Sequence, residues 1–291
     1  MAAMSNRWIM LLPALAVIGL LFAGGVALAA AESLGLAGPA GGEGFTLRHY
    51  AGLVRDGEAG AALWLTLKLA MAATAISAAA GLALALGLRE AAQRSRAVNA
   101  LLQLPLAAPH ATMAGALLTI LAPSGLLARA AFAVGWIGAP ADFPALLNDR
   151  HGVGIVLAYV LKETPFIAVM TLALLARLGD EYEQAARVLG ATAWQRFRHV
   201  TLPLVAPAVV SSSLMVFAFI FGAFEIPFLL GRPYPAMLPV VAQQRFLDAD
   251  LAARPGAIAM AVGSTLLATA MAWLYLRLTR ALLGLERPFV L

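Results

Sequence analysis

Six stretches of this chain are each long and apolar enough to cross a lipid bilayer, and this feature limits its possible folds more than any other. An α-helix needs about 20 consecutive, mostly apolar residues to span the hydrocarbon core. The stretches cover residues 8–31, 61–88, 101–121, 153–176, 205–230 and 257–276. Because lipid offers no hydrogen bonds, each backbone segment must satisfy its own polar groups, which a helix does. We therefore expect an all-α, polytopic integral membrane protein with six transmembrane helices.

The scarcity of charge agrees with this expectation. Hydrophobic residues make up 62% of the chain and charged residues only 12%, against about 25% charged in an average soluble domain. Too few polar side chains are present to cover a water-facing surface, so the lipid bilayer is the expected surrounding. The chain contains no cysteine, which excludes disulfides and thiolate metal sites.

The orientation follows from the arginines between the spans. The loops at residues 89–96, 177–204 and 277–287 are rich in arginine, and loops of this kind stay on the cytoplasmic side. This predicts a bacterial inner-membrane protein with a cytoplasmic N-terminus and with residues 32–60 in the periplasm. The basic sequence pI of about 10.1 is then explained by these loops, and no nucleic-acid partner is expected.

Three further assignments concern the chain's organisation. The first span is preceded by Arg7 and contains a sequence that resembles a cleavage site. Its apolar run exceeds the about 7–15 residues of a signal peptide, so we expect a retained anchor. Residues 125–136 are predicted to form a short helix at the outer surface. Residues 1–60 are predicted as an N-terminal helix with a periplasmic segment, and residues 61–283 as a membrane core with a cytoplasmic loop at 180–203.

That loop carries the most informative local pattern. Residues 181–189 favour a short helix with acidic residues in its first turn, where the helix dipole stabilises them. Gly190 is a typical C-terminal stop, and its position predicts a positive φ angle. Thr192 can cap a second short helix that runs to Val200. Pro203 is then predicted to turn the chain toward the fifth span.

The surface of this helix–turn–helix supports two interpretations. Ala185, Ala186 and Gly190 form a small face that another backbone could approach closely. Trp194 and Phe197 are large apolar residues among arginines. Such a surface suits docking into a groove of a partner protein, and it equally suits an amphipathic helix resting on lipid headgroups. The chemistry of these residues alone does not decide between the two.

The spacing of the loop residues resembles a known family. The order of two alanines, three intervening residues, a glycine, nine further residues, an aliphatic residue, one residue and a Leu-Pro pair is similar to the signature loop of permease subunits of binding-protein-dependent ABC importers. That family usually has Glu directly before the alanines, whereas this chain has Gln184 there and Glu183 one place earlier. The prolines of the third span, Pro165-Phe166 and residues 221–224 extend the resemblance over about 61–283. The loop residues that it implies are Glu183, Gln184, Ala185, Ala186, Gly190, Val200, Leu202 and Pro203.

The resemblance implies a mechanism and partners. The fold would be that of a type I ABC importer transmembrane domain, which forms the solute path. A separate cytoplasmic ABC ATPase dimer would bind ATP and Mg, and its grooves would receive the loop. A second permease subunit, homologous or identical, and a periplasmic solute-binding protein would complete the importer. The phosphate-binding pattern G-x-x-x-x-G-K-[ST] does not occur in this sequence, so the chain is expected to be a non-catalytic subunit with no cofactor of its own.

The solute is less constrained than the mechanism. Residues 221–231 resemble the spermidine/putrescine-type branch, which favours a small organic solute such as a polyamine. Sulfate, molybdate, iron or aminophosphonate permeases are the alternatives within the family. An ATPase-independent channel or scaffold would be a different class of protein, and it would not need the docking loop. An intramembrane protease would need paired aspartates or H-E-x-x-H, and neither lies in the predicted spans.

Charged residues inside the spans are candidates for the translocation path. Glu225, Glu163 and Lys162 are the predicted path residues. For Lys162, and for Lys68 in the second span, a structural role is the stronger interpretation, as a Lys–Glu pair between helices or a snorkelling side chain. For Glu225, beside Pro227, both roles stay open. His110 has no partner at metal-ligand spacing, and we expect no metal site.

Overall fold

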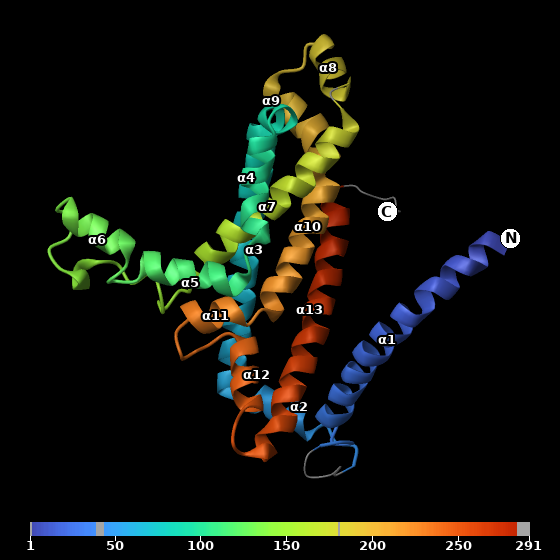
Figure 1. Ribbon diagram of the computed structural model, residues 1–291, viewed down its shortest axis with the longest axis vertical. Helices are drawn as coiled ribbons and strands as arrows, with labels where there is room; N and C mark the ends of the chain where they lie inside the picture. Colours follow the sequence, from blue (N-terminus) through green and yellow to red (C-terminus); the bar gives the residue numbers. More distant parts are fainter. Residues whose placement is uncertain (1, 39–43, 180, 284–291) are drawn as a thin grey trace. The chain divides into compact units, whose positions relative to one another are not determined.

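The computed structural model describes residues 2–38, 44–179 and 181–283, and the ordered elements in these ranges are helices (Figure 1). Six of them are long and apolar enough to cross a membrane. The prediction of an all-α, multi-pass membrane fold is therefore confirmed. Four predicted spans coincide with long helices: α1 (Ala2–Ser33), α3 (Gly57–Arg94), α7 (Val153–Leu178) and α13 (Arg254–Leu283). The fifth predicted span begins within α10 (Leu202–Gly222).

The third predicted span, residues 101–121, is wrong as a single helix. The chain forms α4 (Arg96–Ala107) and α5 (His110–Leu121), and Ala108 between them is extended, with ψ of 131°. Pro109 explains this break, because a proline disfavours the helical conformation of the residue before it. In Figure 1, α5 leaves the direction of α4 and runs across the helices beside it.

The apolar segment that begins with α5 continues beyond the end of this helix. Residues His110–Ala133 are long and apolar enough to count as a membrane span, although a turn at residues 122–125 divides them into α5 and α6 (Leu126–Ala133). The predicted short helix at 125–136 therefore exists as α6. Its location at the outer surface stays a prediction.

The fifth predicted span, residues 205–230, is also interrupted. α10 ends at Gly222, and the short helix α11 (Glu225–Leu230) follows after an extended Ala223 with ψ of 139°. In an unbroken helix the ring of Pro227 would clash with the carbonyl four residues earlier, which belongs to Ala223. The break falls at that residue and removes the clash.

The contacts divide the chain into two compact units. One contains the described parts of residues 1–61 and 238–266, and the other contains those of residues 62–237 and 267–291. The second unit has a continuous apolar core from α3, α5, α7, α10 and α11. In this unit α7 packs against α4, α5, α10 and α11. Helices approach closely there: a Cβ added to Gly81 of α3 would lie 2.8 Å from the Cβ of Ile167 in α7.

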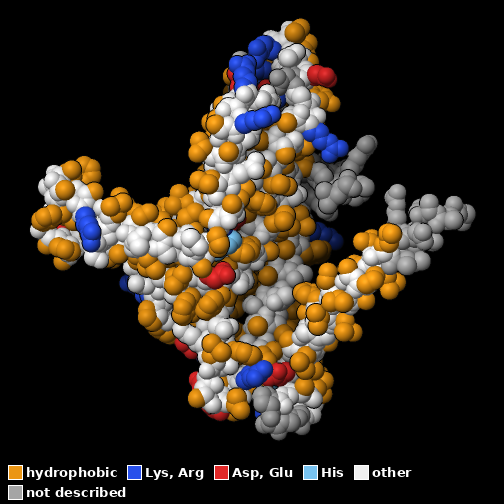
Figure 2. All heavy atoms as spheres, viewed as in Figure 1, with side chains coloured by type: hydrophobic (Ala, Val, Ile, Leu, Met, Phe, Trp, Pro, Cys, Tyr) orange, Lys and Arg blue, Asp and Glu red, His pale blue; other side chains and the backbone are white. Residues whose placement is uncertain are grey.

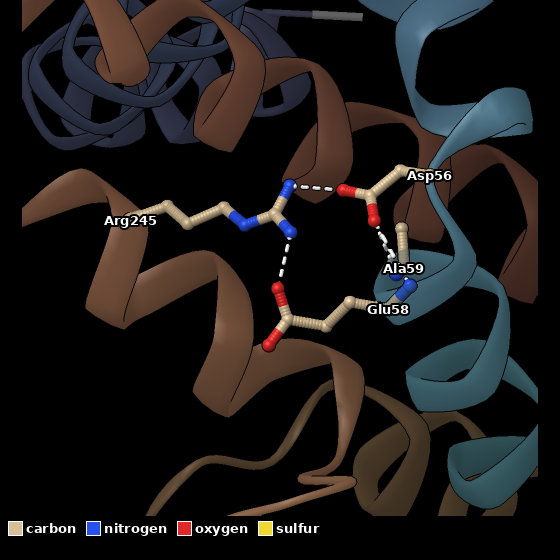
Figure 3. Close-up of polar contacts among 4 residues, drawn as sticks. All are labelled: Asp56, Glu58, Ala59 and Arg245. Carbon is tan, nitrogen blue, oxygen red and sulfur yellow. Dashed lines mark hydrogen bonds and ion pairs between the residues drawn. The ribbon is translucent and has the colours of Figure 1, made fainter.

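In the first unit, Arg245 bonds the carboxylates of Asp56 and Glu58, and we call this contact the arginine clamp (Figure 3). Arg245, in α12 (Leu238–Phe246), contacts Asp56 Oδ2 at 2.6 Å and Glu58 Oε2 at 2.5 Å. The other oxygen of Asp56 accepts hydrogen bonds from the backbone N–H groups of Glu58 (2.9 Å) and Ala59 (3.3 Å). Asp56 thus caps the first turn of α3 while it holds α12. The hydrogen bond from Arg245 favours the carboxylate and holds the pKa of Asp56 below its ordinary value.

We predict that Asp56→Asn makes the protein less stable at neutral pH and less sensitive to acid. Because the folded pKa lies below the ordinary value of 3.8, the ion pair stabilises the fold fully above that pH, and the contribution is lost as the pH falls through the folded pKa. Asn can still cap the helix, so the loss at neutral pH reports the ion pair, at about 1 kcal/mol. Thermal unfolding in detergent at neutral and acidic pH measures it.

Glu90→Gln is the matched control, because Glu90 pairs with Arg94 at 3.9 Å and both side chains are more than 80% exposed. This control should leave the acid dependence of unfolding unchanged. Equal acid sensitivity in Asp56→Asn and the parent protein would contradict a role for the clamp.

Candidate functional site

The predicted cytoplasmic loop folds as two short helices around a tight turn. α8 (Glu181–Val188) is followed by α9 (Ala193–Arg196). Gly190 has φ of +80°, as its position predicted. Its N–H donates to the carbonyl of Arg187 (3.0 Å), and the N–H of Ala191 donates to the carbonyl of Ala186 (3.0 Å). These bonds close the end of α8 around a left-handed residue, which glycine adopts without a steric cost.

The cap of the second helix is also confirmed. The Thr192 hydroxyl accepts a hydrogen bond from the backbone N–H of Gln195 (3.3 Å), and the Gln195 side chain accepts one from the backbone N–H of Thr192 (2.8 Å). This reciprocal capping box satisfies two backbone donors that a helix start would leave free. The turn between α8 and α9 is therefore fixed at both ends.

The predicted turn at Pro203 is wrong, because the chain stays helical from α9 into α10. Residues Phe197–Thr201 form a π-helix, and the N–H of Leu202 bonds to the carbonyl of Phe197, five residues earlier. Pro203 cannot donate and would clash with a carbonyl four residues back in a regular α-helix. The wider π turn accommodates it. The loop and the fifth span are thus one continuous helical rod, from Ala193 to Gly222.

The tip of the loop exposes large apolar side chains. Val188 is 87% exposed, Leu189 86% and Trp194 65%. Two exposed arginines are close in the sequence: Arg187 directly precedes Val188, and Arg198 follows Trp194 by four residues. Figure 2 shows basic side chains gathered at the end of the second unit where α8 and α9 lie. An apolar patch with a charged rim marks an interaction surface more often than a merely solvated one.

The residues of the signature loop separate into outward and inward positions. Gln184, Ala185, Gly190 and Pro203 are exposed, whereas Glu183, Ala186, Val200 and Leu202 are partly buried. Glu183 contacts two residues that the sequence did not single out: its carboxylate lies 3.1 Å from Arg89 of α3, and it accepts a hydrogen bond of 2.6 Å from Thr201. Arg89 belongs to an arginine-rich segment of the sequence, but no sequence pattern predicts its contact with Glu183.

The predicted path residues Lys162 and Glu163 lie at the break between α4 and α5. Lys162 is 4% exposed and Glu163 8%. The Lys162 ammonium donates to the carbonyls of Pro105 (3.0 Å) and Ala108 (2.5 Å). The Glu163 carboxylate lies 3.3 Å from Nε2 of His110. The two neighbouring side chains therefore have different partners, and His110, which the sequence analysis set aside, is one of them.

The arrangement matches the charges of the helix ends. The carbonyls at the C-terminus of α4 have no helical donors, and a lysine both bonds them and complements the negative end of the dipole. His110 begins α5, where the positive end of the dipole favours the carboxylate of Glu163. The His110 ring also lies 4.4 Å from that of Phe219 in α10. Adjacent residues of α7 thus bind the two sides of one helix break.

The other charged candidates are exposed. Glu225 is the first residue of α11 and lies directly after the break that ends α10, and Lys68 lies on α3. Over the described ranges, no three histidine, aspartate or glutamate side chains gather closely enough to hold a metal ion. The exposed end formed by α8 and α9 suits docking to a partner protein. The charged residues among the helices suit either a polar lining of a path or a structural contact that holds the helices together.

We predict that Lys162→Met lowers the stability of the protein in detergent by about 1–3 kcal/mol, because it leaves buried carbonyls without a donor. Lys68→Met, which removes an exposed lysine from a neighbouring helix, is the control and should change stability little. Thermal unfolding of both variants measures the difference. Equal stability of the two variants would show that the carbonyls at the break do not need Lys162.

Comparison with protein families supports the resemblance seen in the loop. A family model described as "Binding-protein-dependent transport system inner membrane component" matches residues 77–284. The sulfate transport system permease protein CysT of Escherichia coli is 32% identical over 136 residues, and the match covers 46% of each chain. The spermidine/putrescine transport system permease protein PotB of Haemophilus influenzae is 31% identical over 137 residues, or 47% of this chain and 46% of the relative. The matched region spans about half the length of these relatives.

A solved structure shares the fold over nearly the whole chain. It is a bacterial ABC transporter involved in the import of the acidic polysaccharide alginate, and its matching chain superposes with a TM-score of 0.76 at 21% identity. The match covers 95% of both chains. At this identity the likeness concerns the fold alone.

Proposed function

Because this chain belongs to the family of binding-protein-dependent transport system inner membrane components, we propose that it is the permease subunit of an ATP-driven importer. One observation carries the proposal. The loop with the signature spacing presents an exposed apolar tip, Val188, Leu189 and Trp194, beside exposed arginines. In this role the helices form the solute path and the loop couples it to a separate ATPase.

The proposed partner at the loop is a cytoplasmic ABC ATPase dimer that binds ATP and Mg. A short helix with an apolar tip fits a groove in a partner protein. The small, exposed Ala185 and Gly190 allow close approach, which a headgroup-bound amphipathic helix does not need. Docking on this ATPase would place the loop and the N-terminus in the cytoplasm of a bacterium, with the helices in its inner membrane. The chain itself is then not an enzyme.

The remaining proposed partners are a second permease subunit and a periplasmic solute-binding protein. The name of the family states the dependence on a binding protein. The alternative, an ATPase-independent channel or scaffold, would leave the exposed tip of α8 and α9 without a partner. Co-purification of the chain with a candidate ABC ATPase and a candidate solute-binding protein from the same organism tests the whole assembly.

For the solute we propose a small organic cation of the polyamine type. The resemblance of residues 221–231 to the spermidine/putrescine branch and the exposed carboxylate of Glu225 beside the α10–α11 break support it. Sulfate is the second candidate, because a sulfate permease matches at 32% identity and a spermidine/putrescine permease at 31%. Calorimetric measurement of the binding of spermidine and of sulfate to the solute-binding protein that co-purifies with this chain separates the two.

We predict that Gly190→Val abolishes solute uptake while the protein stays in the membrane at a near-normal amount. A β-branched residue at φ of +80° is strained by about 1–3 kcal/mol. Among the described residues, its two chain neighbours aside, no heavy atom lies within 4 Å of a Cβ added there, so the effect acts on the turn and on the docking surface and not on the membrane helices. Membrane abundance, co-purification of the ATPase and ATP hydrolysis are measured together.

Gly190→Asn is the matched variant, because asparagine tolerates the left-handed conformation. Loss of uptake in Gly190→Val but not in Gly190→Asn would show that the turn conformation matters. Loss of uptake in both variants would show that the docking surface needs a small residue. If both variants keep uptake and stimulated ATP hydrolysis, the proposed docking role of the loop is wrong.

We predict that Glu225→Gln reduces spermidine uptake while the complex still assembles, because the carboxylate attracts a cation entering the path. Sulfate uptake should stay equal or rise in the same variant, since the removed charge repels an anion. Radiolabelled uptake of both solutes into proteoliposomes measures the effect, with Glu90→Gln as a control at an exposed carboxylate. Unchanged uptake of spermidine, or a fall in the uptake of sulfate, would contradict a role of the Glu225 charge in the path.

A further inference from the structure

Arg89 joins α3 to the loop and to the end of α7. Its guanidinium lies 3.1 Å from Glu183 Oε2, and its other terminal nitrogen donates to the carbonyl of Gly179 at 3.0 Å. Gly179 caps the C-terminus of α7, where a cation complements the helix dipole. The Arg89 side chain is only 13% exposed. One arginine near the end of α3 therefore bonds the end of α7 and the first turn of α8.

Glu183 extends this connection to α10. Its second oxygen, Oε1, accepts a hydrogen bond of 2.6 Å from the Thr201 hydroxyl. Thr201 is 5% exposed and ends the π-helix that leads into α10. The carboxylate of Glu183 thus uses one oxygen for α3 and the other for the start of α10.

The space around this connection is open. A pocket of about 470 Å³ lies between the end of α3 and the loop, and both Arg89 and Glu183 line it. Its other lining residues include the charged Glu90, Arg187 and Arg196. The Arg89–Glu183 ion pair therefore joins the end of α3 to the loop at the edge of an open, polar pocket.

From this geometry we propose that Arg89 and Glu183 are positioning residues that make the α8–α9 loop move as one body with the ends of α3 and α10. The inference rests on the proposed function, in which an ATPase moves the loop. Glu183 directs its carboxylate toward Arg89 and Thr201, whereas the neighbouring Gln184 is exposed and lines the same pocket.

Distances between spin labels test this proposal without knowledge of the solute. The chain has no cysteine, so two introduced cysteines are the only labelled sites in it. Tyr182→Cys lies on α8 at a position 57% exposed, and Ala83→Cys lies at an exposed position on α3. The complex with the co-purifying ABC ATPase is measured without nucleotide and after trapping with ATP, Mg and vanadate. With Arg89 present, the distribution of distances between the two labels should be narrow, and its mean should be equal in the two states.

In Arg89→Ala we expect a broader distance distribution that differs between the two states. Arg94→Ala is the matched control, because Arg94 lies on the same helix with its side chain 82% exposed, and it should behave as the parent. Arg89→Lys keeps the charge but cannot reach both Glu183 and Gly179 in the same fork geometry, so an intermediate width is expected. The exchange Arg89→Glu with Glu183→Arg should narrow the distribution again.

Two results would overturn the proposal: a distance that changes on trapping in the parent, or a distribution in Arg89→Ala as narrow and constant as that of the parent. Either can occur while the ATPase still co-purifies, and then only the link is wrong. If the ATPase does not co-purify with the unsubstituted chain, the proposed function fails, and this proposal fails with it.

Discussion

A backbone carbonyl or N–H group without a partner costs several kcal/mol in the bilayer interior, and the rest of this structure depends on how the chain meets that constraint. Long helices satisfy it along most of the chain. At the breaks near Pro109 and Pro227, helical bonds are lost. At the first break, Lys162 supplies donors to the carbonyls of Pro105 and Ala108. A charged side chain that would be costly in lipid is thus stabilised by the groups that the break leaves free.

α7 supports both breaks. It packs against α4 and α5, which flank the first, and against α10 and α11, which flank the second. Its Lys162 and Glu163 bind on either side of the first break. Charge inside the membrane is a reason to suspect a solute path, but these contacts give both residues a structural task. The exposed Glu225 has no such task among the contacts described, which is why it is the stronger candidate for the path.

The same physics connects the loop to the membrane helices. The π turn before Pro203 keeps α9 and α10 in one rod, so a force on the loop reaches α10 through backbone hydrogen bonds. The Arg89–Glu183 pair adds a polar connection to α3. A loop that docks through its tip and is braced at its base can transmit movement, whereas a loop attached by a flexible turn could not.

The sequence by itself determined the helical membrane class, four of the six spans and the geometry of the turn between α8 and α9. These follow from apolar length and from residues acting on their own neighbours, as Gly190 and Thr192 do at the turn between α8 and α9. It did not determine the outcome at prolines: helices break directly before Pro109 and four residues before Pro227, while Pro203 lies within a continuous helix, because each outcome depends on the donors and space around the proline. Only the tertiary structure decided which partners the charged residues take. His110 and Glu163 are 53 residues apart in the chain, and such pairs form only where packing brings distant segments together.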